Sequence, residues 1–427
     1  MSFIQETLAP IKIPQIVKVK QHFSQEHLEP EEIKSQLRQQ LTALQGYKKI
    51  KPGQRIAITA GSRGIDHMAY ITRTVCDLVK EAGASPFIVP AMGSHGGATA
   101  EGQAHMLEIN GITEESMQVP ILSSMDAVQI GTFDGDRPIY MDKYAHEADG
   151  IILINRIKAH TSFRGTYESG LMKMMAIGLG KQLGAQNYHQ TGYKPFPHII
   201  EAAGKEVIRL ENIVFAVGII ENSFNKVKKI ACLDARQISE QEPVLLKEAY
   251  QTLPLPFFRQ VDVMIVKAIG KNISGTGCDS NVSGRFNNEH YHGDISVTRM
   301  GLLSLTAETN GNGTGMGMAD FITRKLFSQL DAEQSYPNAI TTTCTIVDKI
   351  PIILDNDRDV IKACIKTSNI LDYDKVRLCI IETSKNMQTF YITPNMVEEA
   401  RAKDVEVIGT PEEIAFDQGG NLQLDFN

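Results

Sequence analysis

Three side chains that could take part in chemistry lie in one apolar, glycine-rich stretch, residues 151–189. His160 follows a short basic segment, Lys173 stands among Met and Leu, and His189 closes the stretch. Histidine exchanges protons near neutral pH. A lysine in apolar surroundings loses its charge easily and can act as a nucleophile. Such residues are hard to explain as core or as solvated surface, so we expect this stretch to carry function.

Two earlier glycine loops add polar groups. Arg63 lies in the loop Gly61–Gly64, and its guanidinium could hold a carboxylate or phosphate through two hydrogen bonds. His95 lies between Ser94 and Gly96, just before an expected helix start. Glycine lets the backbone approach a ligand, and a helix N-terminus attracts anions. Ser94 and Gly96 are therefore candidate contacts to an anionic cofactor.

Each of these residues also has a purely structural interpretation. Arg63 could form a surface ion pair, and His95 and His160 could be ordinary loop histidines. Lys173 could extend its amine to solvent past apolar neighbours. His95, His160 and His189 could instead bind zinc, although their spacing is long and the chain has no HExxH pattern.

The surrounding pattern indicates how the candidates are positioned. Apolar strands are expected at 55–60, 86–91 and 151–154, each followed by a glycine-rich or polar loop and then a helix. Alternating strands and helices favour a parallel sheet covered by helices, and ligands bind beyond the carboxyl ends of such strands. Arg63, His95 and His160 each follow one of these ends and can converge.

The rest of the chain continues the α/β pattern, after residues 1–20 as an edge hairpin or extended arm. Further strands are expected at 213–220, 261–266, 340–347, 376–381 and 405–408, and helices at 31–45, 66–81, 197–210, 237–252, 319–330, 357–369 and 394–402. The linker-like Pro254–Pro256 places a boundary between a domain of residues 1–255 and a domain of residues 256–427. The fold class is thus two α/β domains with mostly parallel sheets.

Composition limits the function classes. The 427 residues are 42% hydrophobic and 22% charged, as in an ordinary globular protein. A net charge of -7 argues against nucleic-acid binding. We find no signal peptide and no apolar run of the ~20 residues that cross a bilayer. Six scattered cysteines without a CxxC pair fit a reducing compartment, so we expect a cytoplasmic protein that binds no membrane.

Taken in order, the candidates resemble the nickel-pincer-dependent lactate racemase family, which contains racemases and epimerases of 2-hydroxy acids. The residues that carry the resemblance are Arg63, His95, His160 with Phe163 and Gly165, Gly170 with Lys173, and His189. The sixteen residues from Lys173 to His189 fit the interval between the family's cofactor lysine and its nickel ligand. The resemblance covers most of residues 50–220.

The resemblance implies two α/β domains with the active site in the cleft between them. Residues 1–255 would form the cofactor-binding, catalytic domain, and residues 256–427 would close over the substrate. The implied cofactor is a nickel-pincer nucleotide, the nickel complex of pyridinium-3,5-bisthiocarboxylic acid mononucleotide. It would be attached covalently to Lys173, with His189 as a nickel ligand. A host that does not make this cofactor would yield protein without it.

The resemblance also assigns roles around the substrate. His95 and His160 would be the acid–base pair, and Arg63 would bind the substrate carboxylate or the cofactor phosphate. Lys271, in a glycine loop at 270–285, and Arg156 are the further candidates for substrate binding. Together with the basic residues near His160, they suggest a 2-hydroxy acid more polar than lactate, such as a sugar acid or a dicarboxylate.

Two other functions remain open from the sequence. One is a zinc-dependent hydrolase that uses His95, His160 and His189. The other is a non-catalytic protein that binds an anion or a nucleotide. The expected activity is that of an isomerase on a small molecule, and the sequence does not indicate an oligomeric state.

Overall fold

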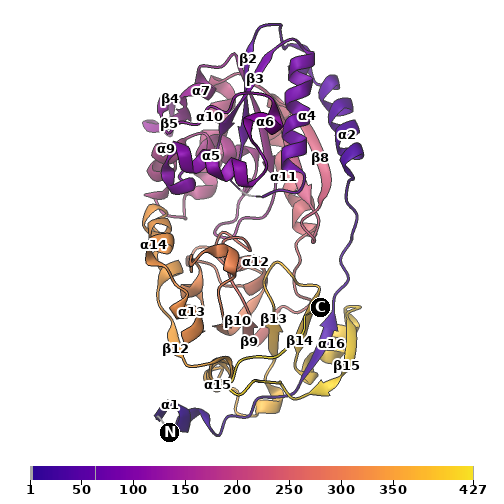
Figure 1. Cartoon of the computed structure of the whole chain (residues 1–427), viewed down its shortest axis with the longest axis vertical. Helices are drawn as coiled ribbons and strands as arrows, with labels where there is room; N and C mark the ends of the chain where they lie inside the picture. The colour runs from indigo at the N-terminus through magenta and orange to yellow at the C-terminus, as the bar shows by residue number, and fades with distance from the viewer. Residues whose placement is uncertain (1–2, 63, 427) are drawn as a thin grey trace. The chain divides into compact units, whose positions relative to one another are not determined.

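The computed structural model describes residues 3–62 and 64–426. The chain divides into two compact units, one of residues Ser24–Leu253 and one that combines the chain up to Phe23 with the chain from Pro254 onward. Both units are α/β with mostly parallel sheets, which confirms the fold class expected from the sequence (Figure 1).

The Ser24–Leu253 unit is built on a five-stranded sheet in the order β3-β2-β6-β7-β8. Its strands are β2 (Arg55–Ala60), β3 (Ser85–Pro90), β6 (Gly150–Arg156), β7 (Ile213–Glu221) and β8 (Val227–Asp234). All neighbours are parallel except β7 and β8. The chain places β3 on one side of β2 and later β6 on the other. Such a reversal of strand order is where parallel sheets form ligand sites.

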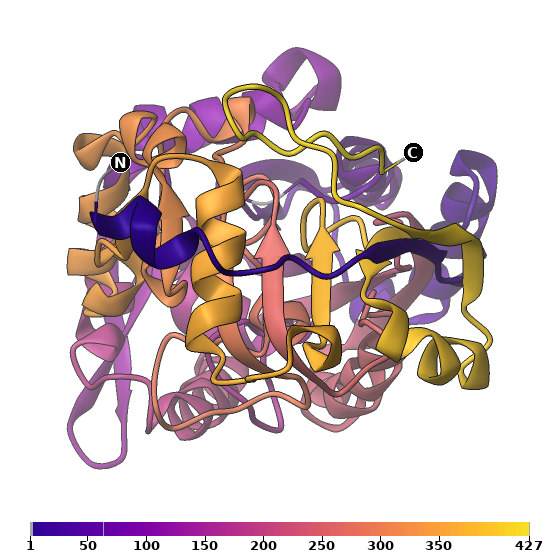
Figure 2. The same ribbon diagram turned by 90° about the horizontal axis from the view of Figure 1, so that it is seen from below.

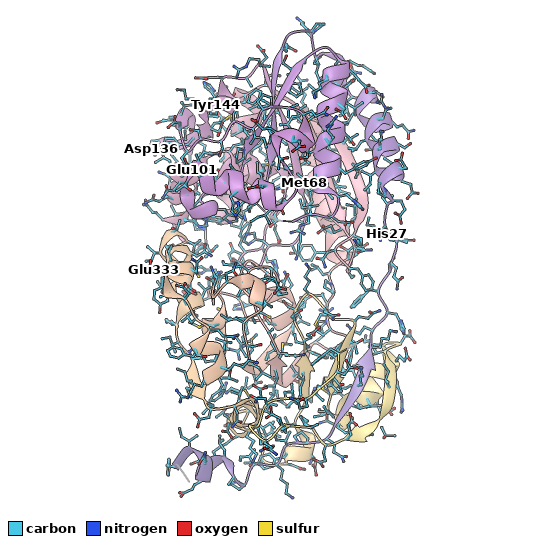
Figure 3. The ribbon with its side chains drawn as sticks, in the orientation of Figure 1. His27, Met68, Glu101, Asp136, Tyr144 and Glu333 are labelled. Carbon is cyan, nitrogen blue, oxygen red and sulfur yellow. The ribbon has the colours of Figure 1, made fainter. Side chains whose placement is uncertain are left out.

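Helices cover this sheet. They are α2 (Pro30–Ala43), α3 (Gln45–Lys48), α4 (Met68–Glu81), α5 (Ala100–Ile109), α6 (Glu114–Met117), α7 (Lys143–His146), α8 (Leu171–Lys173), α9 (Lys181–His189), α10 (Phe196–Leu210) and α11 (Ala235–Gln251). Among the longer ones, α2, α4 and α10 cover the sheet with one apolar face. In α2, Ile33, Leu37 and Leu41 recur every four residues and are fully buried in the core shared with α4 (Figure 1). A hairpin of β4 (Ala127–Phe133) and β5 (Arg137–Asp142) carries Asp136 in its turn (Figure 3).

The other unit contains an eight-stranded sheet in the order β12-β11-β10-β9-β13-β14-β1-β15. Its strands are β1 (Ile16–Lys20), β9 (Gln260–Val266), β10 (Ser296–Leu302), β11 (Phe321–Thr323), β12 (Ile352–Leu354), β13 (Leu378–Ile381), β14 (Thr389–Ile392) and β15 (Glu406–Glu412), and its helices are α1 (Phe3–Leu8), α12 (Ser280–Ser283), α13 (Arg324–Ser328), α14 (Ala332–Thr341), α15 (Asp357–Thr367) and α16 (Val397–Ala402). The strands from β12 to β13 are parallel, and the last three pairings are antiparallel.

Two expectations from the sequence are wrong in this unit, and a third is narrowed to one of its two alternatives. Residues 340–347 are the end of α14 and a 3₁₀ turn, not a strand, although Thr, Val and Ile favour strands. Strand preference depends on the packing that a segment finds, so the composition misled here. Residues 319–330 were expected to form one helix, but they contain the short strand β11 followed by the short helix α13. Of the edge hairpin or extended arm expected at residues 1–20, the hairpin does not form, and the segment contributes the strand β1, which lies between β14 and β15 (Figure 2).

Among the residues that the structure describes, no helix has both the length and the apolar character required to cross a membrane.

Candidate active site

The site is built on the loops that follow β3, β2 and β6. Ser62 follows β2 and His95 follows β3, and the Ser62 hydroxyl is hydrogen bonded to Nδ1 of His95. The predicted convergence of strand ends is therefore present for these two loops. Arg63 lies outside the described residues. The imidazole of His95 is exposed, as a group that meets a substrate must be.

The loop after β6 is held in a fixed shape around His160. Lys158 and Ser169 exchange two backbone hydrogen bonds, which close the loop at its base. The buried carboxylate of Glu168 accepts hydrogen bonds from the backbone nitrogen of His160 (2.6 Å) and from the hydroxyl of Tyr250 (2.8 Å). Burial raises the pKa of Glu168, and these hydrogen bonds act in the opposite direction. The backbone of His160 is thus fixed before any ligand binds.

The side chains of His160 and Lys173 touch. Nζ of Lys173 lies 2.5 Å from Nε2 of His160. On the other side of the ring, Nδ1 accepts a hydrogen bond from the backbone nitrogen of Ser162 at 3.0 Å. Because Nδ1 accepts, the proton of a neutral imidazole is on Nε2, where it faces the lysine amine. This geometry favours a Lys173 amine with an available lone pair, the form that acts as a nucleophile.

Lys173 lies at a distorted point of its helix. It ends α8 and is followed directly by a π-helical turn, Met174–Gly178. Such turns often occur at functional sites. The residues around the lysine are buried, whereas Lys173 itself is half-buried. The start of α8 is fixed by Glu242 of α11, whose Oε2 accepts a hydrogen bond from the backbone nitrogen of Met172 at 2.9 Å.

An aromatic cluster connects His160 with His189. We use this name for Phe163, Phe196 and Tyr193. The His160 ring stacks on Phe163 with centroids 4.2 Å apart, and Phe163 lies 5.5 Å from Phe196. The His189 ring lies 4.8 Å from Phe196. The structure therefore brings both histidines against one apolar surface, in a single region of the Ser24–Leu253 unit.

The environment of His189 favours its neutral form. The pKa of His189 is lowered to about 4, first by burial and then by the positive charge that Lys173 carries when protonated. A neutral imidazole has a ring nitrogen lone pair that can bind a metal, whereas the protonated ring has none. At neutral pH His189 is therefore ready to act as a ligand.

The glycine loop after β3 has structural reasons for its composition. Gly96 has φ of +66°, and a Cβ there would lie 2.6 Å from the carbonyl carbon of Gly102 in α5. The glycine is thus required by the close approach of the helix, whatever the loop binds. Ser94 is half-buried beside it. The predicted cofactor contacts of Ser94 and Gly96 remain predictions.

Two predicted substrate-binding residues have partners within the protein. Arg156, at the end of β6, forms a close ion pair with the buried Glu221 of β7. Lys271 donates a hydrogen bond to the carbonyl of Gly275 at 2.8 Å and lies in the other unit. Its positive charge also acts on Asp348, whose pKa burial raises to about 6. A substrate role for Arg156 and Lys271 remains a prediction.

The glycine loop of that unit, residues 270–285, packs against a second glycine-rich loop, residues 309–321. A Cβ on Gly277, which has φ of +71°, would lie 2.4 Å from the carbonyl oxygen of Thr314. The close backbone approach that the glycines suggest is thus made by the neighbouring loop.

The arrangement of possible metal ligands distinguishes a zinc site made of three histidines from a metal held by one histidine and a cofactor. Among residues 3–62 and 64–426, no group of three or more His, Cys, Asp or Glu side chains is arranged to hold a metal ion. His95, His160 and His189 therefore do not form the three-ligand set that a catalytic zinc site requires. A metal held by a single histidine and by ligands from a cofactor is not subject to this test.

Several residues of the site were not foreseen from the sequence. They are Ser62, Glu168, Tyr193, Phe196, Glu242 and Tyr250. Each acts through a partner far away in the chain or through ring packing, so no local motif marks it. The aromatic spacing Tyr193–Phe196, just after His189, was the one signal that could have found part of the cluster.

One comparison with known proteins covers the region of the chain that contains this site. Residues 4–195 match the family model described as the lactate racemase N-terminal domain, a range that contains His95, His160, Lys173 and His189. No curated protein matches the sequence.

Among solved structures, the fold is similar to that of the lactate racemase apoprotein from Thermoanaerobacterium thermosaccharolyticum. The TM-score is 0.52 at 10% identity, over 86% of this chain and 98% of the other. At that identity the likeness concerns the fold alone, and the sequence match supplies the relationship. Residues 4–195 are therefore similar in sequence to the N-terminal domain of lactate racemases, and the fold of the chain is similar to that of a lactate racemase.

Proposed function

We propose that the protein is a racemase or epimerase that inverts C2 of a 2-hydroxy acid. The observation that supports this proposal most directly is the contact of Lys173 with His160, 2.5 Å from nitrogen to nitrogen, next to the aromatic cluster that also holds His189. A nucleophilic amine, a proton-transferring imidazole and a neutral metal-binding imidazole are the groups that this reaction needs in one place.

These residues fit a nickel-pincer nucleotide. The Lys173 amine would form the covalent attachment, and His189, kept neutral by burial, would be a nickel ligand. Imidazole is a suitable ligand for nickel. When bound, the cofactor supplies an acceptor and donor of hydride at C2. The flat apolar faces of the aromatic cluster suit a planar group beside the lysine.

The proton chemistry belongs to the chain itself. In each direction one histidine removes the proton of the substrate hydroxyl, and the other returns a proton to the oxygen when the opposite enantiomer forms. His95 and His160 can do this because they follow strands β3 and β6, which flank β2 on opposite sides. The hydrogen bond with Ser62 fixes the His95 ring, and the contact with Ser162 fixes that of His160.

The residues of the site support a 2-hydroxy acid as substrate but do not select one member of that class. Two basic residues that suggested a polar substrate are engaged in the protein: Arg156 with Glu221, and Arg164 with the carbonyl of His160 at 2.6 Å. A sugar acid or dicarboxylate stays our proposal, supported by Lys158 near the site. The choice is tested by comparing lactate with dicarboxylic and polyhydroxy 2-hydroxy acids.

Protein made in a host that synthesises the cofactor tests the function. We expect an intact-mass increment, one nickel per chain, and conversion of one pure enantiomer into a mixture on chiral chromatography. Lys173→Ala should lose the increment and the activity. Lys247→Ala, an exposed lysine on α11, is the matched control and should keep both.

Other outcomes would identify the alternatives. Stoichiometric zinc with ester or amide hydrolysis, and no mass increment, would replace the proposal with a hydrolase. Tight binding of an anion, without metal, increment or turnover, would indicate a binding protein. Racemisation that survives in Lys173→Ala would contradict the role of Lys173.

A further inference from the structure

A second lysine on the same stretch is buried without touching the candidate site. Lys181 has no exposed surface, and its Nζ contacts three acceptors. These are the carbonyl of Pro90 at 2.8 Å, Oε1 of Gln103 at 2.9 Å and Oδ2 of Asp142 at 3.2 Å. The contacts to Pro90 and Gln103 are hydrogen bonds, and the contact to Asp142 is an ion pair. The lysine amine is therefore held inside the protein by acceptors from three separate segments.

Gln103 extends this contact to the loop of His95. Its Nε2 donates to the carbonyl of Gly93 at 2.8 Å and to the carbonyl of His95 at 3.2 Å. With its Oε1 on Lys181, one orientation of the amide satisfies every contact. Gln103 is itself fully buried. A continuous polar chain thus runs from Lys181 to the backbone of His95.

Lys181 also begins the helix that ends at His189. It is the first residue of α9 and has φ of +54°, a left-handed conformation that costs free energy for a lysine. Replacing a buried ion pair by apolar side chains is often neutral or stabilising, so stability alone explains such a pair poorly. The arrangement connects the loop of one candidate base with the helix of the candidate metal ligand.

We infer that Lys181 and Gln103 are positioning residues that fix the His95 loop relative to the start of the His189 helix. The inference rests on the proposed function for the roles of His95 and His189, but the physical link itself can be measured without turnover. In Gln103→Glu, a carboxylate can still accept from Lys181, whereas both donors to the His95 loop are lost. Gln103→Met removes the acceptor as well.

Amide hydrogen exchange of the protein without cofactor is the primary test. We expect exchange over residues 93–98 to become roughly tenfold faster in Gln103→Glu, since two hydrogen bonds are lost. Strands β6 and β7 should exchange as in the wild type. Gln182→Met, an exposed position next to Lys181, is the control and should leave the loop unchanged.

Turnover of the loaded enzyme is the second measurement. We expect kcat to fall by about tenfold or more in Gln103→Glu, with KM changed by less than about threefold, because a misplaced base slows the chemical step more than binding. Unchanged exchange at residues 93–98 in both Gln103 variants overturns the inference, whatever the activity. Faster exchange throughout the unit overturns it too, because that indicates general destabilisation. If the loop is loosened in Gln103→Glu but the loaded wild-type enzyme does not racemise any 2-hydroxy acid, the proposed function is overturned and the link between Lys181, Gln103 and the loop stands.

Discussion

The contact between His160 and Lys173 determines which ring nitrogen of the histidine faces the lysine amine. Nδ1 of His160 is occupied by the backbone nitrogen of Ser162, so the ring meets the lysine through Nε2. A lysine in this setting is prepared for covalent attachment before any cofactor arrives.

Selective acylation of Lys173 follows from this contact. An ordinary lysine is a neutral amine in fewer than about one molecule per thousand at pH 7. We expect Lys173 to react with an acetylating reagent several-fold faster than Lys247, and His160→Gln to remove the advantage. Peptide mass spectrometry of the protein without cofactor measures both rates. Equal rates in the wild type and His160→Gln would contradict the role given to the imidazole.

A buried carboxyl group behind the lysine predicts an unusual pH dependence of stability. Glu242 is 1% exposed, and burial raises its pKa to about 8, with the backbone hydrogen bonds from Met172 and Leu171 acting in the opposite direction. The folded protein therefore holds a proton there that the unfolded chain releases near pH 4.3. Between these values, stability falls as the pH rises.

Glu242→Gln should remove that dependence. The amide oxygen can still accept from Met172, and no charge has to be buried. We expect the variant to gain stability over the wild type between pH 6 and pH 9, by a few kcal/mol in order of magnitude. Denaturant unfolding at both pH values measures this, with the exposed Glu240→Gln on the same helix as the control. A parallel pH profile for the two proteins would refute the assignment.

At the scale of elements, the strands that position the site could be predicted well. Residues 55–60 and 86–91 are short apolar runs bounded by glycine, a pattern that fits buried parallel strands. β8 and the β4–β5 hairpin were not foreseen, because their alternating burial is partial and leaves a weak pattern. Segment 340–347 was misjudged because strand preference depends on packing.

Some residues of the candidate site could also be predicted from the sequence, and others could not. His95, His160, Lys173 and His189 stand out as polar residues in apolar or glycine-rich context, so sequence reasoning could select them. The residues that hold these side chains and their loops in place could not be predicted from the sequence. Gln103 and Glu168 look like surface residues until packing, which joins positions 78 and 82 residues apart in the chain, buries them.

The loop from Lys158 to Ser169 is an element with its own anchor, Glu168. We expect Glu168→Gln to lower the free energy of unfolding by about 1–3 kcal/mol, because the new NH2 group faces a donating backbone nitrogen in either orientation, that of His160 or that of Gly165. Tyr250→Phe removes one hydrogen bond and should cost only about 1 kcal/mol. The free energy of unfolding from denaturant curves ranks the two variants. A larger loss in Tyr250→Phe would show that the tyrosine, not the carboxylate, anchors the loop.

For the whole molecule, the division into domains differs from a cut at residue 255. The sequence assigns residues 1–255 to one domain, but the chain up to Phe23 belongs to the unit that begins again at Pro254. The cause is β1, whose Val19 pairs with Phe390 of β14 and with Val407 of β15. Along the chain, the Ser24–Leu253 unit thus lies between β1 and the other strands of the second unit's sheet. A strand pairing across that distance leaves no local signal.

Removal of the first 23 residues should therefore damage the unit formed mainly by the end of the chain. Three apolar side chains of β1, those of Ile16, Val17 and Val19, are fully buried. Their loss removes roughly 5 kcal/mol of burial free energy or more, at about 1.5–3 kcal/mol each. It also leaves β14 and β15 without their shared neighbour.

Hydrogen exchange distinguishes this from a general effect. We expect β14 and β15 to lose protection in the shortened chain, while β2, β6 and β7 keep theirs because their pairings lie within Ser24–Leu253. Phe3→Ser, at a side chain 83% exposed on the same segment, is the control and should leave every strand protected. Equal loss in both sheets would mean that the two units unfold together. Unchanged protection of β14 would show that β1 adds little to the sheet it joins.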